Sequence, residues 1–213
     1  MGRLVDVRRR TELLDGVVAY LAERGIAGVS LRPMAKSLGV SVNALVHHFG
    51  TKDDIVVAAL RRAIEVQDHV QARWTARNPG LSQAELLRRW WRWLNSSASN
   101  LSLVRLGIEA AAMDATATGL PGAVRADQIG LWRSHIEQRL IAEGVQIDVA
   151  GVEASLVKAM FTGLVVDLLA TGEKRRLGRA LELGLDRLTE VLRFARRPTA
   201  SRRGTTSPSG PCP

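Results

Sequence analysis

The side chains best suited to contacting DNA lie in one short segment, residues 32–52. Asn43 carries both a donor and an acceptor, which suits the edge of an adenine, and Arg32 can reach a phosphate or a guanine. The other candidates are small apolar groups that fit a thymine methyl group, and imidazole or ammonium groups that reach phosphates or bases: Val42, Ala44, His47, His48 and Lys52. These groups can contact DNA if the segment folds into a helix that enters a groove.

The sequence around these residues predicts two short helices joined by a tight turn. Ser30 is a strong N-cap, because its hydroxyl can accept a backbone N–H, and Pro33 falls in the first turn, where its missing N–H costs nothing. Gly39 ends this helix in a left-handed conformation. Ser41 can cap a second helix that buries Leu45. The pattern is a helix-turn-helix, whose second helix can enter a DNA major groove.

The flanking segments extend the pattern. Thr11–Arg24 carries an apolar face and stops at Gly25, and Thr51 can cap a long helix after the motif. Over about Arg8 to Leu60 the chain resembles the TetR family of bacterial one-component transcriptional regulators. The most specific piece of this resemblance is the run A-K-S-L-G-V-S-V-N-A-L-V-H-H-F-G-T-K.

The resemblance implies which residues read DNA. It sets the reading helix at Val42–His48 and its base-facing residues at Val42, Asn43, Ala44 and His47. The chain departs from the family at Val46, where a Tyr usually grips a phosphate through its hydroxyl. Val cannot do so, and we expect weaker backbone anchoring that other donors must compensate. The fold is not in doubt, because this position is not in the core.

Several of these residues have an ordinary alternative. Asn43 and Lys52 can simply be solvated, and His48 can pack against the first helix as a core histidine. Arg8–Arg10, together with Arg3, form a basic arm before the first helix. That arm is equally consistent with DNA contact and with ordinary solvated charge.

Composition narrows the class of protein. The 213 residues are 46% hydrophobic, enough for a folded core, and carry a formal net charge of +9. Ten basic and three acidic residues lie in 174–213, so most of the excess charge is outside the helix-turn-helix and supports DNA binding only weakly. The single cysteine, Cys212, excludes an internal disulfide or a cysteine zinc site. Charged residues directly after Leu4 and Val5 argue against a signal peptide, so we expect a cytoplasmic protein.

No group of residues predicts catalysis. The chain has four histidines and no glycine-rich phosphate loop, and His47 and His48 lack a metal-binding partner at helical spacing. We therefore expect no enzyme activity, no metal and no cofactor. The longest apolar run, Met160–Ala170, contains Asp167 and is too short to cross a bilayer, so we expect no membrane partner.

The fold class predicted is all-α, with about nine helices. Apolar residues recur at helical spacing nearly throughout, and no segment alternates as a strand does. Beyond the motif the expected helices are Lys52–Ala76, Gln83–Asn95, Leu101–Met113, Val124–Glu143, Val149–Ala170 and Lys174–Arg196. We expect a helix-turn-helix domain at 1–50, a regulatory ligand-binding and dimerisation domain at 51–197, and a disordered tail at 198–213.

Arginines alternate with tryptophans in Arg88–Trp93, which invites a nucleic-acid interpretation. Helical spacing favours core or pocket positions for the tryptophans and an outer face for the arginines. The predicted pocket lining, each member of which can equally be plain core, is Trp90, Trp93, Leu106, Glu109, Met113, Trp132, His135, Met160, Phe161 and Leu164. Such a lining suits a hydrophobic or aromatic ligand, and Glu109 or Asp114 suits a cation.

The last two helices carry more apolar surface than one bundle needs, and Gly163 and Gly184 allow close helix approach. The resemblance implies that they form a four-helix interface in a homodimer. Asp167, in an otherwise apolar run, can contact a ligand, lie at that interface, or be exposed at the helix edge.

The predicted function is a homodimeric repressor that binds a double-stranded DNA operator. A small hydrophobic effector would release it by moving the helix at Lys52–Ala76. The alternative is a DNA-binding regulator without a small-molecule ligand, controlled by a protein partner. A sealed regulatory core favours the alternative, and an open apolar cavity argues against it. Neither the effector, nor the operator sequence, nor repression as opposed to activation follows from the residues.

Overall fold

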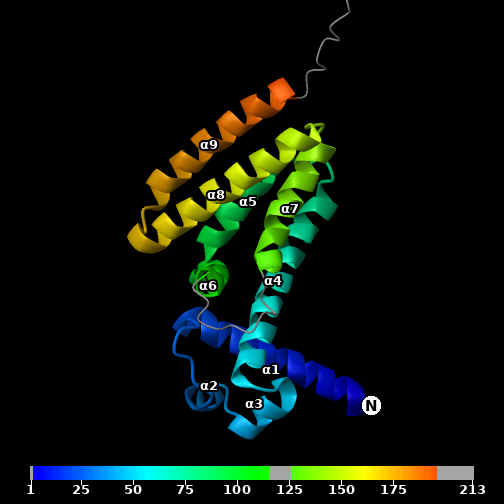
Figure 1. Cartoon of the computed structure of the whole chain (residues 1–213). Helices are drawn as coiled ribbons and strands as arrows, with labels where there is room; N and C mark the ends of the chain where they lie inside the picture. The colour runs from blue at the N-terminus through cyan, green and yellow to red at the C-terminus, as the bar shows by residue number, and fades with distance from the viewer. Residues whose placement is uncertain (1, 116–125, 196–213) are drawn as a thin grey trace, which may run out of the picture.

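The computed structural model describes residues 2–115 and 126–195, and these residues form helices joined by short loops (Figure 1). The helices are α1 (Gly2–Arg24), α2 (Leu31–Ser37), α3 (Val42–Phe49), α4 (Lys52–Arg77), α5 (Gln83–Ser96), α6 (Ala98–Ala115), α7 (Ala126–Ala142), α8 (Ile147–Thr171) and α9 (Lys174–Ala195). No strand occurs in the described ranges, and the predicted all-α fold is confirmed.

Two helices begin earlier than predicted. The segment containing Arg8–Arg10 is not an arm but part of α1, because no helix breaker separates it from Thr11 and Arg8 pairs with Glu12 across one turn at 2.8 Å. Helix α6 begins at Ala98, where the Ser97 hydroxyl accepts the backbone N–H of Asn100. The predicted start of α7 at Val124 and the predicted tail at 198–213 lie outside the described residues.

Two of the three predicted N-caps are confirmed, and α5 is capped in the same way. Ser41 accepts the backbone N–H of Ala44, and Thr51 and Ser82 each form a reciprocal capping box. Ser30 occupies the N-cap position of α2, but its side chain makes no capping hydrogen bond, so that prediction is wrong in detail. Gly39 has a φ of 67°, the left-handed conformation expected for the tight turn.

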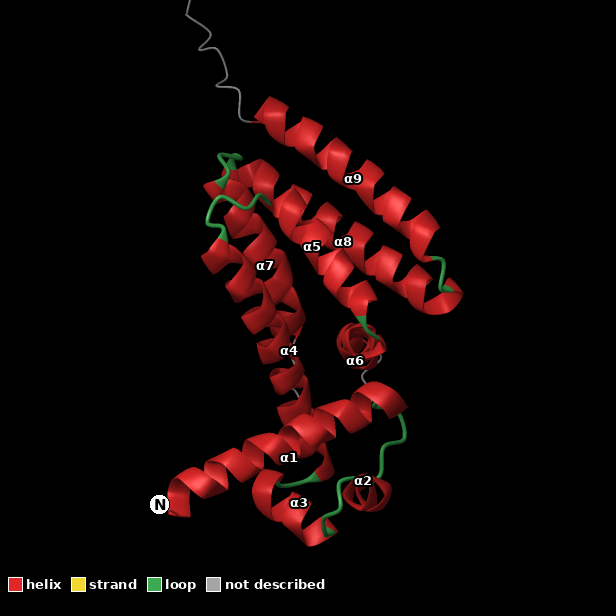
Figure 2. Cartoon of the chain, turned by 180° about the vertical axis from the view of Figure 1, so that it is seen from behind, coloured by secondary structure: helices red, strands yellow, loops and turns green. Residues whose placement is uncertain are grey.

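Two hydrophobic cores lie at opposite ends of α4. The lower core joins α1, α2, α3 and the first half of α4, and it also takes Leu106 and Ala110 from α6. The upper core joins α5, α7, α8 and α9 to Val70 of α4. Figure 1 shows α4 rising from one body to the other, with α6 between them, and Figure 2 shows the same from behind. The predicted domain boundary at residues 50 and 51 stays a prediction, since the lower core extends past it.

Helix α8 is, within the described ranges, the one helix whose length and composition would allow it to cross a membrane. The sequence expectation rested on the shorter run Met160–Ala170. Over a longer stretch of α8 the mean hydropathy stays high, although charged residues interrupt it. The helix packs against α7 and α9, yet only 28% of its apolar window is buried. Val152, Leu156 and Val166 are among the apolar side chains of α8 that the described chain leaves uncovered.

Candidate functional site

The candidate DNA-reading surface is the outer face of α3. Leu45, fully buried in the lower core, fixes the inner face of this helix. Asn43, Val46 and His47 are all exposed and lie three and four residues apart, so they share one face. Val46 is 43% exposed, as expected for a position outside the core. The predicted contacts Val42 and Ala44 flank this face and are half-buried.

Exposed basic groups border this face on two helices. Arg32 projects from the first turn of α2, and Lys52 is the first residue of α4. The start of α4 is rigidly formed, because Asp54 accepts hydrogen bonds from the backbone N–H and the hydroxyl of Thr51. These hydrogen bonds, the one from the hydroxyl first, hold the pKa of Asp54 below its usual value. Lys52 therefore adds its charge to a fixed, electropositive helix N-terminus.

The end of α3 is held against α1 by Arg10. Its Nε donates to the carbonyl oxygen of His48 at 3.2 Å, and its guanidinium lies 5.2 Å from the centre of the Phe49 ring. His48 itself is half-buried beside Phe49, between its two predicted roles of DNA contact and core histidine. Of the four arginines predicted as an arm, Arg8 and Arg10 have partners within the chain, the exposed Arg9 makes no hydrogen bond or ion pair with a described residue, and the side chain of Arg3 lies outside the described part.

A cavity of about 350 Å³ lies in the upper body between α4, α5, α6, α7 and α8. Three helices each present four residues to it at the same helical spacing, so each contributes one continuous face. The described lining is Ile64, Gln67, Asp68 and Gln71 of α4; Trp90 of α5; Val104, Gly107, Ile108 and Ala111 of α6; Trp132 and His135 of α7; and Lys158, Phe161, Thr162 and Val165 of α8. This volume is within the range of small-molecule sites.

Four of the predicted pocket residues line the cavity: Trp90, Trp132, His135 and Phe161. Five others do not, and their placement corrects the prediction: Trp93, Leu106, Glu109, Met160 and Leu164. Trp93 stacks on Trp90 from outside the cavity, with ring centres 4.6 Å apart. Leu106 belongs to the lower core, and Leu164 packs on the upper core. Met160 lies so close to Gly184 that a Cβ added to this glycine would collide with the methionine sulfur. The side chains of Met113 and Asp114 lie outside the described residues.

Glu109 serves the contact between the two bodies. Its carboxylate accepts the backbone N–H of Ile26 at 3.1 Å and lies 3.3 Å from the Nε of Arg105. Arg105 in turn donates to the carbonyl oxygen of Ala22 at 2.6 Å. The end of α1 is thereby clasped by α6, and Glu109 already has the cationic partner that a ligand was predicted to supply.

Sequence reasoning missed the polar part of the lining. Gln67, Asp68 and Gln71 of α4, and Lys158 and Thr162 of α8, sit among apolar residues on the cavity-facing side of their helices. The signal was present as polar residues three or four positions apart on otherwise apolar faces. It was overlooked on α4 because that helix was interpreted as a connector, and on α8 because only apolar residues were assigned to the pocket.

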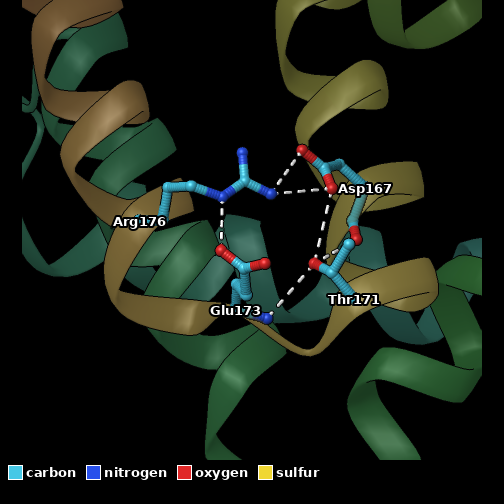
Figure 3. A network of polar contacts seen from close by, with 4 residues as sticks. All are labelled: Asp167, Thr171, Glu173 and Arg176. Carbon is cyan, nitrogen blue, oxygen red and sulfur yellow. Dashed lines mark hydrogen bonds and ion pairs between the residues drawn. The ribbon is translucent and has the colours of Figure 1, made fainter.

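Asp167 is paired within the chain. Both of its carboxylate oxygens lie 2.9 Å from the guanidinium of Arg176, which also binds Glu173 (Figure 3). Thr171 donates to the carbonyl oxygen of Asp167 at 2.8 Å. The pairs with Glu173 and Asp167 raise the pKa of Arg176 above its ordinary value. This network fixes the corner between α8 and α9, so the charge of Asp167 has a structural use.

The arginine and tryptophan segment of α5 is mostly core, as predicted. Trp90 and Trp91 are buried, and Trp91 meets Phe161 edge to face. Arg88 lies on the outer side and binds Glu182 and Asp186 of α9. This segment therefore attaches α9 to the bundle.

The sequence match to a known protein family falls on the segment that carries the reading surface. The family model for bacterial regulatory proteins of the tetR family matches residues 13–59. The transcriptional repressor KstR2 of Rhodococcus jostii is 42% identical over 53 residues, or 25% of this chain and 26% of that protein. The matched segment thus spans about a quarter of the length of this curated relative.

Solved structures match over most of the chain. A transcriptional regulator from Rhodococcus sp. Rha1 is 26% identical, with a TM-score of 0.69 over 89% of this chain and 98% of its own. The multidrug binding protein EbrR, complexed with malachite green, is 27% identical, with a TM-score of 0.62 over 84% of this chain and 97% of its own. Residues 13–59 thus form a domain of the tetR family of bacterial regulatory proteins, within a fold that most of the chain shares with solved regulators.

Proposed function

We propose that this protein is a homodimeric transcriptional regulator that binds a two-fold symmetric DNA operator through α3. The observation that carries the proposal is the exposed face of Asn43, Val46 and His47, fixed from behind by Leu45 and bordered by Arg32 and Lys52. Asn43 suits an adenine edge, and the basic groups suit phosphates. Such a regulator acts in the cytoplasm, where the chromosome is.

The uncovered apolar face of α8 supports the dimer. Five exposed residues of this helix follow one another at steps of four and three, which places them on one side: Val152, Leu156, Ala159, Gly163 and Val166. Leu183 is exposed on α9 as well. Burying these groups against a second copy removes apolar surface from water. A four-helix interface of α8 and α9 is the arrangement we propose.

The cavity supports control by a small molecule. An open, mainly apolar cavity was expected to distinguish control by a small molecule from control by a protein partner. The presence of such a cavity favours the small molecule. EbrR, which shares the fold, binds malachite green and, in another complex, proflavin. We propose a small, mainly hydrophobic effector whose binding releases the operator.

Two helices can transmit that binding. Helix α4 lines the cavity at 64–71 and begins beside the reading surface at Lys52, so about 18 Å of rigid helix joins the two sites. Helix α6 lines the cavity on one face and clasps the end of α1 through Arg105 and Glu109 on another. A ligand that shifts either helix changes the separation of the two reading helices, which must match half-sites about 34–36 Å apart.

Selection of bound duplexes from a random pool tests the DNA proposal. We expect a short inverted repeat, bound by a dimer in sedimentation. A monomer at micromolar concentration, or recovery of sequences without symmetry, would contradict the dimeric operator. Adding candidate small molecules to the selected complex then tests release: compounds that raise the melting temperature should also weaken operator binding.

A further inference from the structure

The cavity holds one charged group that is half-buried and lacks a partner. Three titratable residues line it: Asp68, His135 and Lys158. Asp68 and His135 are exposed, and water can solvate them, whereas Lys158 is half-buried. No described residue makes a hydrogen bond or an ion pair with the Lys158 ammonium. A charge withdrawn from water without a partner is unfavourable, so this position favours an anionic ligand group.

The walls beside Lys158 are aromatic. Phe161 and Thr162 follow Lys158 by one helical turn and line the same side of the cavity. Phe161 meets Trp132 edge to face, with ring centres 5.4 Å apart, and Trp90 contributes a further indole from α5. The α6 wall has an opening at Gly107, where an added Cβ would meet nothing within 4 Å. Aromatic walls and an open slot fit a flat ring system.

A cationic ligand has less support. Glu109, predicted to suit a cation, is outside the cavity and paired with Arg105. Asp68 is exposed, and an exposed carboxylate contributes little to binding. Resting on the ligand site of the proposed function, we propose that the effector is a flat, mainly apolar aromatic acid. Its ring lies among Trp90, Trp132 and Phe161, and its carboxylate pairs with Lys158.

Three probes that share a naphthalene ring system and differ in charge test this inference: the anionic 2-naphthoate, the neutral 2-naphthalenemethanol and the cationic 2-naphthylmethylammonium. Binding to the full-length dimer is followed at pH 7 by calorimetry. A charge-assisted hydrogen bond at a half-buried site favours the acid over the alcohol by about tenfold or more. The inference is overturned if the cation binds most tightly, if acid and alcohol bind equally, or if none of the three binds.

Variants assign the preference to Lys158. Lys158→Met should remove the advantage of the acid and leave the alcohol unchanged, and Lys158→Arg should retain most of the advantage. Asp68→Asn is the matched control at the exposed charge and should change acid binding by less than about twofold. Gly107→Leu should fill the slot and abolish binding of all three probes. Unchanged alcohol binding by Lys158→Met shows that the cavity is intact, and unchanged acid binding by that variant contradicts the assignment.

Operator binding without probe separates this inference from the proposed function. Lys158→Met should bind the selected operator as the wild type does, since Lys158 is on α8, which lies in the upper body, whereas α3 lies in the lower body (Figure 1). If the protein binds the operator but none of the probes, the proposal of an aromatic-acid effector is overturned and the DNA-binding proposal stands. Probe binding without operator recognition does the reverse.

Discussion

The lower and upper bodies of this molecule differ in how completely side chains fill their interiors. In the lower body, Leu21, Met34, Leu45 and Ile55 are all fully buried, and polar groups are left to the outer face. In the upper body, a core of similar residues surrounds a cavity of about 350 Å³, with half-buried polar side chains on its walls. Dense packing holds reading residues in one geometry, whereas a cavity accepts a guest and can adjust to it. The contrast separates a densely packed body, which carries the proposed reading surface, from a body that carries the proposed ligand cavity.

The largest expected effect comes from disrupting the proposed dimer interface, to which only helices of the upper body contribute. Leu156 is 58% exposed in the chain and lies on the uncovered face of α8. Leu156→Glu would place an unpaired charge in the proposed interface, a cost of several kcal/mol, so dimer dissociation should rise by more than about a hundredfold. Operator affinity should fall with it. Sedimentation measures the dimer. Ile141→Glu, on α7, is the control and should remain dimeric; if both variants behave alike, the interface is elsewhere.

The next effect compares the two cores directly. Leu45→Ala and Leu140→Ala each truncate a fully buried leucine, one under α3 and one in the upper core, and each should cost about 2–5 kcal/mol in unfolding free energy. Urea titration measures that cost. At temperatures where both variants are folded, only Leu45→Ala should weaken operator binding, because only Leu45 holds the reading helix. Equal loss of DNA affinity in the two variants would mean that the bodies are not separable.

A smaller effect dissects the reading surface. Asn43→Ala should lose about 1–3 kcal/mol of discrimination at the base pair it reads, and less of total affinity. Lys52→Ala should weaken all sequences alike and reduce the salt dependence of binding by about one unit. Salt titrations on the operator and on an unrelated duplex distinguish these outcomes. Identical behaviour of the two variants would show that the assigned roles are wrong.

The two bodies also differ in how much of them follows from sequence. The caps at Ser41 and Thr51 and the turn at Gly39 are local signals, readable from neighbouring residues, and these signals correctly predicted how α3 and α4 begin and how the turn before α3 is formed. The cavity, in contrast, is formed by residues that lie far apart in the sequence. Lys158 and Gln67 line it together only because α4 and α8 lie on different walls of the same cavity, an arrangement that no short pattern encodes. Glu109 looked like a ligand group for the same reason: its partner at Ile26 is 83 residues away.

The smallest expected effect concerns Val46, where the lower body departs from its family. If this exposed position lacks a phosphate contact that the family's Tyr makes, Val46→Tyr should supply it. One neutral hydrogen bond contributes about 0.5–1.5 kcal/mol, so operator affinity should rise several-fold at most. The preferred sequence should not change, since phosphate contacts position a protein without reading bases. Fluorescence anisotropy on the selected operator measures the gain.

The rival account gives Val46 a direct role in reading, through contact with a thymine methyl group. Its position on the face shared by Asn43 and His47 is compatible with that contact as well. Replacing the thymine with uracil removes the methyl group and leaves every hydrogen bond of the base pair in place. A wild type indifferent to uracil, together with tighter binding by Val46→Tyr, assigns the position to the DNA backbone. Weaker binding of the wild type to uracil, together with weaker operator binding by Val46→Tyr, assigns it to the base and makes Val46 part of the operator code.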